Sequence, residues 1–177
     1  MADLFGWIDW SLIGFILIAF VAAMSGAVFK PGAWYAGLAK PSWNPPNWLF
    51  PIAWSVLYAM IAVSGWSAYQ AAGGFAAAPV AFGAYFAQLF FNFGWSAVFF
   101  GMKRPDLGLI EVGLLWFSIL INMMLFTAID PSAGWLLLPY FLWVSFAARL
   151  NHEIWRINPA ESADFAPWRR PARAAAA

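Results

Sequence analysis

The chain has 177 residues, of which 64% are apolar, 20% are aromatic and only 10% are charged, and its net charge is +1. Soluble domains carry about 25% charged residues, so this chain has too few charges to cover a water-facing surface. The composition excludes an ordinary soluble enzyme and also excludes intrinsic disorder, which requires low hydrophobicity. The absence of cysteine and the presence of one histidine, His152, exclude disulfides, thiolate chemistry and histidine-rich metal sites.

Long segments without charge predict an all-α, polytopic membrane protein with a five transmembrane helix bundle over residues 1–158. A helix needs about 20 apolar residues to cross a bilayer. Turn signals at 71–74 and 130–133 divide the longer segments. We expect helices at about 7–29, 48–71, 80–101, 107–129 and 135–157, and a flexible Ala/Pro/Arg-rich tail at 159–177. Asp3 and Asp9 stand where a cleaved signal peptide would carry Lys or Arg, so the first helix is expected to remain.

The distribution of basic residues predicts an orientation in the membrane. With five spans, all nine Lys and Arg residues fall at the end that holds the 30–46 loop and the C-terminus. The other end holds Asp3, Asp9 and Asp130 and no basic residue. The positive-inside rule then places the N-terminus outside and the C-terminus in the cytoplasm. Residues Trp10, Trp48 and Trp135 near helix ends fit an interfacial aromatic belt.

The 30–46 loop, KPGAWYAGLAKPSWNPP, is long for a connection between neighbouring helices and is rich in proline. Proline lowers the entropy of an ordered loop. Its three aromatic residues, Trp34, Tyr35 and Trp43, favour a folded lid over the helix bundle. The alternative is a loop that lies among the lipid headgroups.

Two predicted helices each present a polar-aromatic face. Four residues of the third helix, at spacings of four, three and four, share one side: Gln88, Asn92, Trp95 and Phe99. Buried amides need partners, so they either join helices together or offer handles to a polar ligand. The fifth helix offers Tyr140, Trp143, Ala147 and Asn151 on one side, and Pro139 can kink it.

Trp54 and Tyr58 repeat this spacing on the second helix. Three helices thus offer aromatic faces, which indicates an inward aromatic cluster suited to a large, flat, apolar ligand. Packing of the core alone would also explain such faces.

A second face of the third helix carries small residues, which let helices approach closely in lipid. These residues are Gly83, Ala87, Gly94 and Gly101. We expect them to form a homodimer interface, while packing within the same chain is the alternative.

Ionisable residues within spans are candidates for function. Glu111 is interpreted as reaching out toward Lys103 and Arg104 at the membrane surface. Arg149 can pair with Glu153 four residues on, and His152, at a helix end, is interpreted as a surface residue rather than a haem ligand. The sequence lacks a Ser/His/Asp set, paired carboxylates inside the bundle and a phosphate-binding loop, so hydrolysis and phosphoryl transfer have no candidate residues.

Four stretches resemble the tryptophan-rich sensory protein (TspO) family, which includes the mitochondrial translocator protein, or peripheral-type benzodiazepine receptor. They are WYAGLAKPSWNPP at 34–46, FPIAWSVLY at 50–58, QLFFNFGWSAVFFG at 88–101 and LPYFLWVSFAARLN at 138–151. They occur in family order. The resemblance implies a five-helix bundle with a ligand cavity under the first loop. The family pocket positions that match are Trp34, Tyr35, Trp43, Trp54, Asn92, Trp95, Trp143, Ala147 and Leu150.

The resemblance also implies a sensor or translocator that binds porphyrin, haem or related tetrapyrroles, and isoquinoline carboxamide or benzodiazepine drugs. It places the protein in a bacterial cell envelope or an organelle membrane, with lipid as a partner and no nucleic acid or obligatory cofactor. Family members that bind sterol tightly carry a tyrosine where this chain has His152, which argues against sterol binding. The alternatives are a light-dependent porphyrin-degrading enzyme that uses Trp54 and Trp143, and a lipid-regulated scaffold.

Overall fold

The computed structural model describes residues 9–159, and these residues form helices and connecting turns without a β-strand. Residues 7–8 of the first predicted helix and residues 160–177 of the predicted tail at 159–177 lie outside the described residues. The helices are α1 (Trp10–Val28), α2 (Ala33–Gly37), α3 (Leu49–Ala72), α4 (Pro79–Ser96), α5 (Pro105–Ile129), α6 (Pro131–Trp135) and α7 (Leu138–Ile157).

Local sequence signals explain where the long helices begin and end. The Asp9 carboxylate accepts hydrogen bonds from the backbone N–H groups of Ser11 and Leu12 and so caps α1. Gly73, with a φ of 80°, ends α3 in the left-handed conformation that glycine tolerates. Helices α4 and α5 each begin at a proline, at the position where the missing N–H group has no helical partner.

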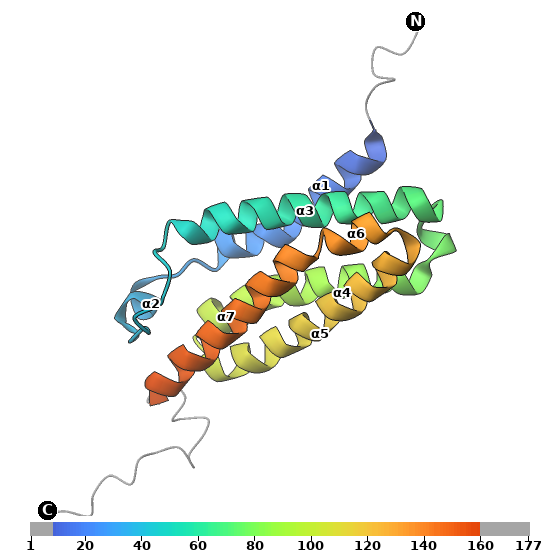
Figure 1. The fold of residues 1–177 in the computed structure, drawn as a ribbon. Helices are drawn as coiled ribbons and strands as arrows, with labels where there is room; N and C mark the ends of the chain where they lie inside the picture. Colours follow the sequence, from blue (N-terminus) through green and yellow to red (C-terminus); the bar gives the residue numbers. More distant parts are fainter. Residues whose placement is uncertain (1–8, 160–177) are drawn as a thin grey trace, which may run out of the picture.

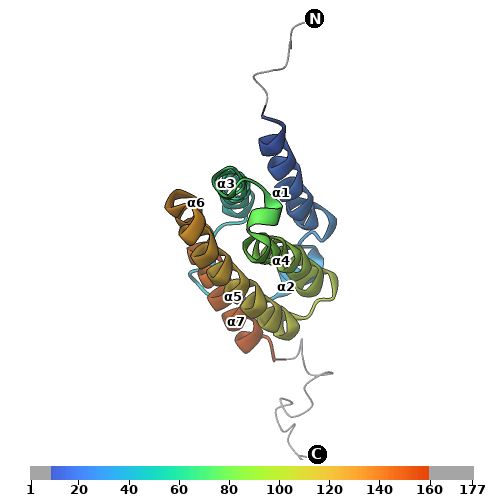
Figure 2. The same cartoon turned by 90° about the vertical axis from the view of Figure 1, so that its right-hand side faces the viewer.

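The long helices form a closed ring around a shared core. Around the ring, α3 packs against α1, α1 against α4, α4 against α5, and α5 against α7, while the short α6 returns to α3. Figure 2 looks along the bundle and shows this arrangement, and Figure 1 shows α2 beyond the end of α3, near the end of α7. The core contains the fully buried side chains of Ile61, Tyr85, Ile119, Phe126 and Tyr140.

Four helical segments within residues 9–159 are long and apolar enough to cross a membrane. They are Trp10–Val28, Leu49–Ala72, Pro105–Ile129 and the combined segment Pro131–Ile157. Helix α4 is not among them. Large apolar side chains such as Phe20, Phe90 and Met124 point away from the bundle and are more than 60% exposed. Such an outer surface suits contact with lipid rather than water.

The structure differs from the expected helices at two places. The third expected helix, 80–101, is an α-helix only to Ser96 and continues as a π-helical turn, Ala97–Gly101. The fifth, 135–157, is preceded by α6, which fills the expected turn at 130–133 because the Asp130 side chain caps it by accepting from the Ser132 N–H. Pro139 does not kink α7, since it lies in the first turn, where no helical N–H is lost.

We predict that Gly65→Ala lowers the stability of the bundle, because Gly65 is the point of closest approach among three helices. A Cβ atom there would lie 2.7 Å from the Tyr85 ring and 2.8 Å from the Phe15 ring. Overpacking of this kind costs about 1–3 kcal/mol. The measurement is thermal unfolding in detergent.

Gly26→Ala is the matched control, because a Cβ atom at Gly26, which also lies in a long helix, meets nothing within 4 Å. This control should keep or slightly raise the unfolding temperature, since alanine favours helix more than glycine does. Equal unfolding temperatures for the two variants would contradict the observed packing at Gly65.

Candidate functional site

The loop between α1 and α3 folds back over one end of the bundle. Its short helix α2 carries Tyr35, which is buried together with Leu38 in the same loop. Both residues belong to one apolar cluster with three side chains of the bundle, and we call this set the lid cluster: Tyr35, Leu38, Phe99, Leu150 and Ile154. The loop therefore covers the bundle rather than extending away from it.

Hydrogen bonds hold the loop in this position. The Asn158 side chain, just beyond α7, accepts from the Ala39 N–H and donates to the Ala39 carbonyl, each at 2.9 Å. The Lys40 ammonium donates to the carbonyls of Tyr35, at 2.6 Å, and Leu38, at 3.0 Å, and it also lies 4.5 Å from the Tyr35 ring centroid. Burial raises the pKa of the Tyr35 hydroxyl, so the ring stays neutral under the loop.

Aromatic rings from the loop, from α4 with its π-helical turn and from α7 pack in and around the lid cluster. Trp95 stacks on Phe99 with ring centroids 5.0 Å apart, and Trp34 meets Phe99 edge-on at 5.9 Å. A second row runs from Trp43 of the loop through Phe146 to Trp143, with successive centroids 5.8 and 5.6 Å apart. The second row connects the predicted site residues Trp43 and Trp143, which are 100 positions apart in the sequence.

Asn92 lies deeper, below these rings, and joins three helices. Its side-chain oxygen accepts a hydrogen bond from the Tyr58 hydroxyl of α3, and its amide nitrogen donates to the Tyr140 hydroxyl of α7 at 2.9 Å. Trp54 packs on both tyrosines, with centroid distances of 5.5 Å to Tyr58 and 6.2 Å to Tyr140. Here the predicted amide is used to fasten the helices together.

Asn151 makes a similar junction closer to the lid. Its side-chain oxygen accepts from the Trp95 indole N–H at 3.2 Å, and its amide nitrogen donates to the Pro105 carbonyl at 2.7 Å. A Cβ atom on Gly108 would lie 3.0 Å from the Asn151 oxygen, so only glycine lets α5 come this close. The junction fixes the plane of the Trp95 ring.

Two predicted site residues hold polar atoms without a partner. The indole N–H of Trp143 is buried and makes no hydrogen bond, and the Gln88 side chain is fully buried with both its oxygen and its nitrogen unpaired. A buried polar group left unpaired costs about 1–3 kcal/mol. These atoms could therefore bond to a polar group of a ligand. The Trp143 indole N–H is the donor that lies within the aromatic rows.

The predicted site residues thus fall into three places. Trp34, Tyr35, Trp95, Phe99 and Leu150 lie at the lid cluster, while Trp43 and Trp143 meet through Phe146. The third group surrounds the Asn92 junction and contains Trp54, Tyr58, Asn92 and Tyr140. Gln88 lies one turn from Asn92 on the same side of α4, and Ala147 is half-buried on α7 between Trp143 and Asn151.

Sequence reasoning missed three residues that complete this arrangement: Phe50, Phe146 and Asn158. Phe50 packs on Trp143 at 6.0 Å, and its place four residues before Trp54 was an available signal. Phe146 also follows Trp143 by one helical turn. Asn158 carried no such signal, since its partner is a backbone group 119 residues away.

The interpretation of Glu111 as a residue that reaches the membrane surface is wrong. Both carboxylate oxygens are buried without a hydrogen-bond partner, and a Cβ atom on Gly94 would lie 3.2 Å from one of them. The side chain points at α4 because the glycine leaves space for it there. The expected pair of Arg149 and Glu153 is present, with a separation of 3.5 Å. Among the described residues, no group of three or more His, Cys, Asp or Glu side chains could hold a metal.

The four small residues of the predicted third helix lie in different surroundings. A Cβ atom on Gly94 would lie 3.2 Å from the Glu111 carboxylate, and one on Gly101, in the π-helical turn, would lie 2.8 Å from the Phe29 ring, both within the same chain. Gly83 is exposed and open, and Ala87 is half-buried. Only the Gly83 end of this face is therefore free to meet a second chain.

Comparisons with known proteins match the described part of the chain. Residues 14–156 match the TspO/MBR family model. Protein CrtK of Rhodobacter capsulatus is 41% identical over 140 residues, which are 79% of this chain and 88% of that protein. The tryptophan-rich sensory protein of Cereibacter sphaeroides is 39% identical, with coverage of 92% and 96%. The human translocator protein is 33% identical, with coverage of 82% and 89%.

We predict that Asn158→Ala loosens the loop, because it removes both hydrogen bonds to Ala39. At an exposed position their joint loss should cost about 1 kcal/mol. Hydrogen exchange at the amides of Leu38 and Ala39 should then become about fivefold faster.

Asn44→Ala is the matched control, since within the described loop the Asn44 side chain donates only to the neighbouring Pro45 carbonyl. It should leave the exchange of Leu38 and Ala39 unchanged. Equal exchange in the wild type and Asn158→Ala would show that the apolar contacts of the lid cluster alone hold the loop.

Proposed function

This chain belongs to the TspO/MBR family, and on that premise we propose that it binds a porphyrin or another tetrapyrrole beneath the lid cluster. Its relatives include proteins named as a tryptophan-rich sensory protein and as translocator proteins, so it is a multi-pass membrane protein of the sensor or translocator type. We also propose where this ligand binds and how the chain is oriented in the membrane.

We propose that the bundle crosses the membrane five times, with α4 as the additional span. Helix α4 has 18 residues and covers about 27 Å at 1.5 Å per residue, and the π-helical turn extends it by five residues toward the lid. That length matches a hydrocarbon core of about 30 Å. The six basic residues among residues 9–159 then lie at the lid end, which favours a cytoplasmic C-terminus and an external N-terminus.

The unpaired indole N–H of Trp143 is the observation that carries the ligand proposal. It is buried among aromatic rings and has no hydrogen-bond partner. A flat aromatic ligand would replace ring–ring contacts with its own and would supply the missing acceptor through a carboxylate or carbonyl oxygen. A porphyrin provides both a flat apolar ring and carboxylates, while isoquinoline carboxamide and benzodiazepine drugs provide rings and a carbonyl.

Entry of such a ligand requires the loop to move, because loop and bundle side chains pack directly against each other. Tyr35 and Leu38 contact Phe99, Leu150 and Ile154 in the described state. The bonds between Asn158 and Ala39 lie at an exposed position, where water competes for them and opening is cheap. We expect ligand binding to slow hydrogen exchange in the loop once the ligand is enclosed. His152 and the absence of a tyrosine at this position keep sterol outside the proposal.

We predict that Trp143→Phe weakens porphyrin binding by about fivefold, because it removes the N–H donor and keeps an aromatic ring. That factor corresponds to about 1 kcal/mol, as for one net hydrogen bond. Trp54→Ala should weaken binding further, by roughly 1–3 kcal/mol, through loss of a buried ring. The measurement is quenching of tryptophan fluorescence by protoporphyrin in the dark.

Trp135→Phe is the control, since Trp135 is 60% exposed and belongs to α6, which lies at the end of the bundle opposite α2 in Figure 1. It should bind porphyrin as the wild type does. Unchanged porphyrin affinity in both Trp143→Phe and Trp54→Ala would contradict the proposed site. The absence of saturable porphyrin binding would favour a lipid-regulated scaffold.

The enzymatic alternative has support in the row of rings that connects Trp54 with Tyr58 and Tyr140. Adjacent electron-rich rings suit electron exchange with a photo-excited porphyrin. In that case porphyrin absorbance would fall under light, and Trp54 and Trp143 would act on the ligand. No loss of absorbance under light would exclude this alternative.

We propose a homodimer through α4 as the assembly of this chain, now centred on Gly83 and Ala87. Gly94 and Gly101 support it less, because they face Glu111 and Phe29 of the same chain. Close approach of two helices at small residues is the usual device for helix association in lipid.

Gly83→Leu should shift the protein from dimer to monomer, because the larger side chain prevents the close approach while open space accommodates it within the fold. Mass measurement in detergent tests this, with Gly26→Leu on α1 as the control, since Gly26 is equally open. A dimer that persists in Gly83→Leu would exclude this interface.

A further inference from the structure

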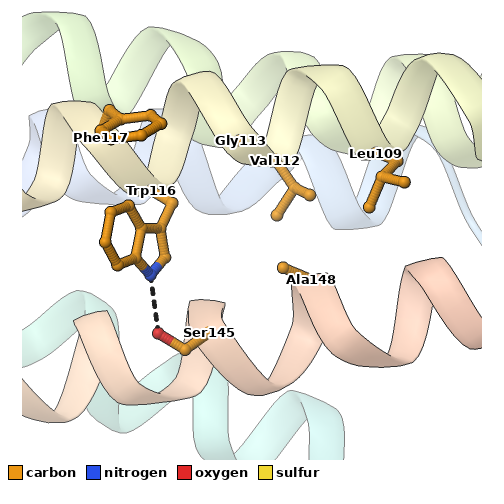
Figure 3. A pocket seen from close by; sticks show the side chains of 7 residues that line it. All are labelled: Leu109, Val112, Gly113, Trp116, Phe117, Ser145 and Ala148. Atoms are coloured by element: carbon orange, nitrogen blue, oxygen red, sulfur yellow. Dashed lines mark hydrogen bonds between the residues drawn. The ribbon is translucent and has the colours of Figure 1, made fainter.

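A groove runs along the outside of the bundle between α5 and α7, away from the lid cluster. It has a volume of about 430 Å³ and is lined by Leu109, Val112, Gly113, Trp116, Phe117, Ser145 and Ala148. Figure 3 shows Trp116 reaching from α5 toward Ser145 of α7 at one end of the groove, and Leu109 at the other end.

Small residues create this hollow. A Cβ atom on Gly113 would meet nothing within 4 Å, and Ala148 on the opposite wall presents only a methyl group. A larger side chain at Gly113 would enter this open space, and one at Ala148 would enter it from the opposite wall. The groove is therefore a feature of these two residue types.

The polar atoms of the groove are already satisfied. The Trp116 indole N–H donates to the Ser145 hydroxyl at 2.8 Å, and that hydroxyl donates to the Phe141 carbonyl at 2.8 Å. The groove thus offers an occupant apolar contact, and an unbranched hydrocarbon chain fits this demand better than a polar molecule.

The surroundings of the groove are lipid. Both of its walls belong to segments long and apolar enough to cross a membrane. The neighbouring side chains of Ile110, Leu114 and Phe117 on α5 point outward and are between 49% and 64% exposed. A phospholipid acyl chain is consequently the molecule that meets this surface first.

A basic residue stands where the groove runs toward the membrane surface. Arg149 follows Ala148 directly and lies four residues beyond Ser145, so it continues the same side of α7. Its side chain is 63% exposed. Its ion pair with Glu153 is long, at 3.5 Å, because that carboxylate also accepts two hydrogen bonds from Arg156. The Arg149 guanidinium can thus contact a phosphate in addition to Glu153.

We propose that this groove binds one anionic phospholipid, with an acyl chain between α5 and α7 and the headgroup phosphate at Arg149. The proposal depends on the membrane location of the chain and is independent of the porphyrin site. It assigns the groove to lipid, and it assigns Arg149 to the selection of anionic over zwitterionic headgroups. A single basic residue near the headgroups contributes about 1 kcal/mol, which corresponds to about a fivefold preference.

Native mass spectrometry in detergent can count the bound lipids and compare phosphatidylglycerol with phosphatidylcholine of the same chain length. The wild type should bind one molecule of phosphatidylglycerol, about fivefold more tightly than it binds phosphatidylcholine. Gly113→Leu should lose this lipid, because the side chain fills the groove. Gly14→Leu on α1 is the matched control, since it adds the same side chain in open space elsewhere. Ala148→Leu fills the groove from the opposite wall and provides an independent variant.

Arg149→Gln should keep the bound lipid but lose the preference for phosphatidylglycerol, while Lys30→Gln, exposed at the end of α1, should keep it. Lipid binding by both Gly113→Leu and Ala148→Leu equal to that of Gly14→Leu would exclude the groove as the site. Equal affinity of the wild type for both lipids, or displacement of the bound phospholipid by an equimolar sterol, would also overturn the proposal.

Discussion

One buried amide, that of Asn92, ties three helices together, because both its oxygen and its nitrogen have partners on other helices, unlike those of Gln88 one turn away. The residue is 3% exposed, and it finds one tyrosine hydroxyl on α3 and another on α7. In hydrocarbon an unsatisfied amide costs several kcal/mol. This requirement orients three helices at once. Apolar contacts alone would not orient them, because lipid tails provide such contacts equally well.

The fixed interior contrasts with the cover above it. Asn92 and Asn151 hold the helices at buried positions, whereas Asn158 holds the loop at an exposed one. Hydrogen bonds exposed to water contribute little, while buried ones are costly to break. The molecule therefore combines buried junctions of tyrosines and amides with a loop held by exposed hydrogen bonds and by the apolar contacts of the lid cluster, and the proposed ligand would lie among the aromatic rows between them.

Much of this architecture could be predicted from residue patterns, because a bilayer demands long apolar helices and turn residues mark their ends. The face with Asn92, Trp95 and Phe99 followed from helical spacing. The π-helical turn around Phe99 could not be predicted, because residue spacing indicates which face of a helix is buried and not where its hydrogen-bond pattern changes. The sequence also could not predict where the Glu111 side chain points, because this depends on the space left by a glycine on another helix. Sequence spacing shows which residues share a face, but not which helix meets that face.

The small residues of α4 illustrate the same limit. Four of them lie at helical spacing, yet two turn out to accommodate side chains of their own chain. Conversely, no periodic pattern in the sequence indicates a role for Gly113. Its importance lies in the space it leaves open beside Ala148 and Trp116. Close contact and open space are properties of a pair of helices, and only the assembled bundle distinguishes them.

The most direct measurement concerns the indole N–H of Trp143, which is buried and unpaired beneath the loop. Nuclear magnetic resonance of protein with labelled tryptophan side chains would follow its N–H signal during a titration with protoporphyrin in the dark. The Trp143 signal, assigned with Trp143→Phe, should move to the position of a hydrogen-bonded indole. The Trp116 signal should stay in place, since its N–H is already bonded to Ser145 outside the site. A Trp143 signal that does not move at saturating porphyrin would contradict the proposed binding site.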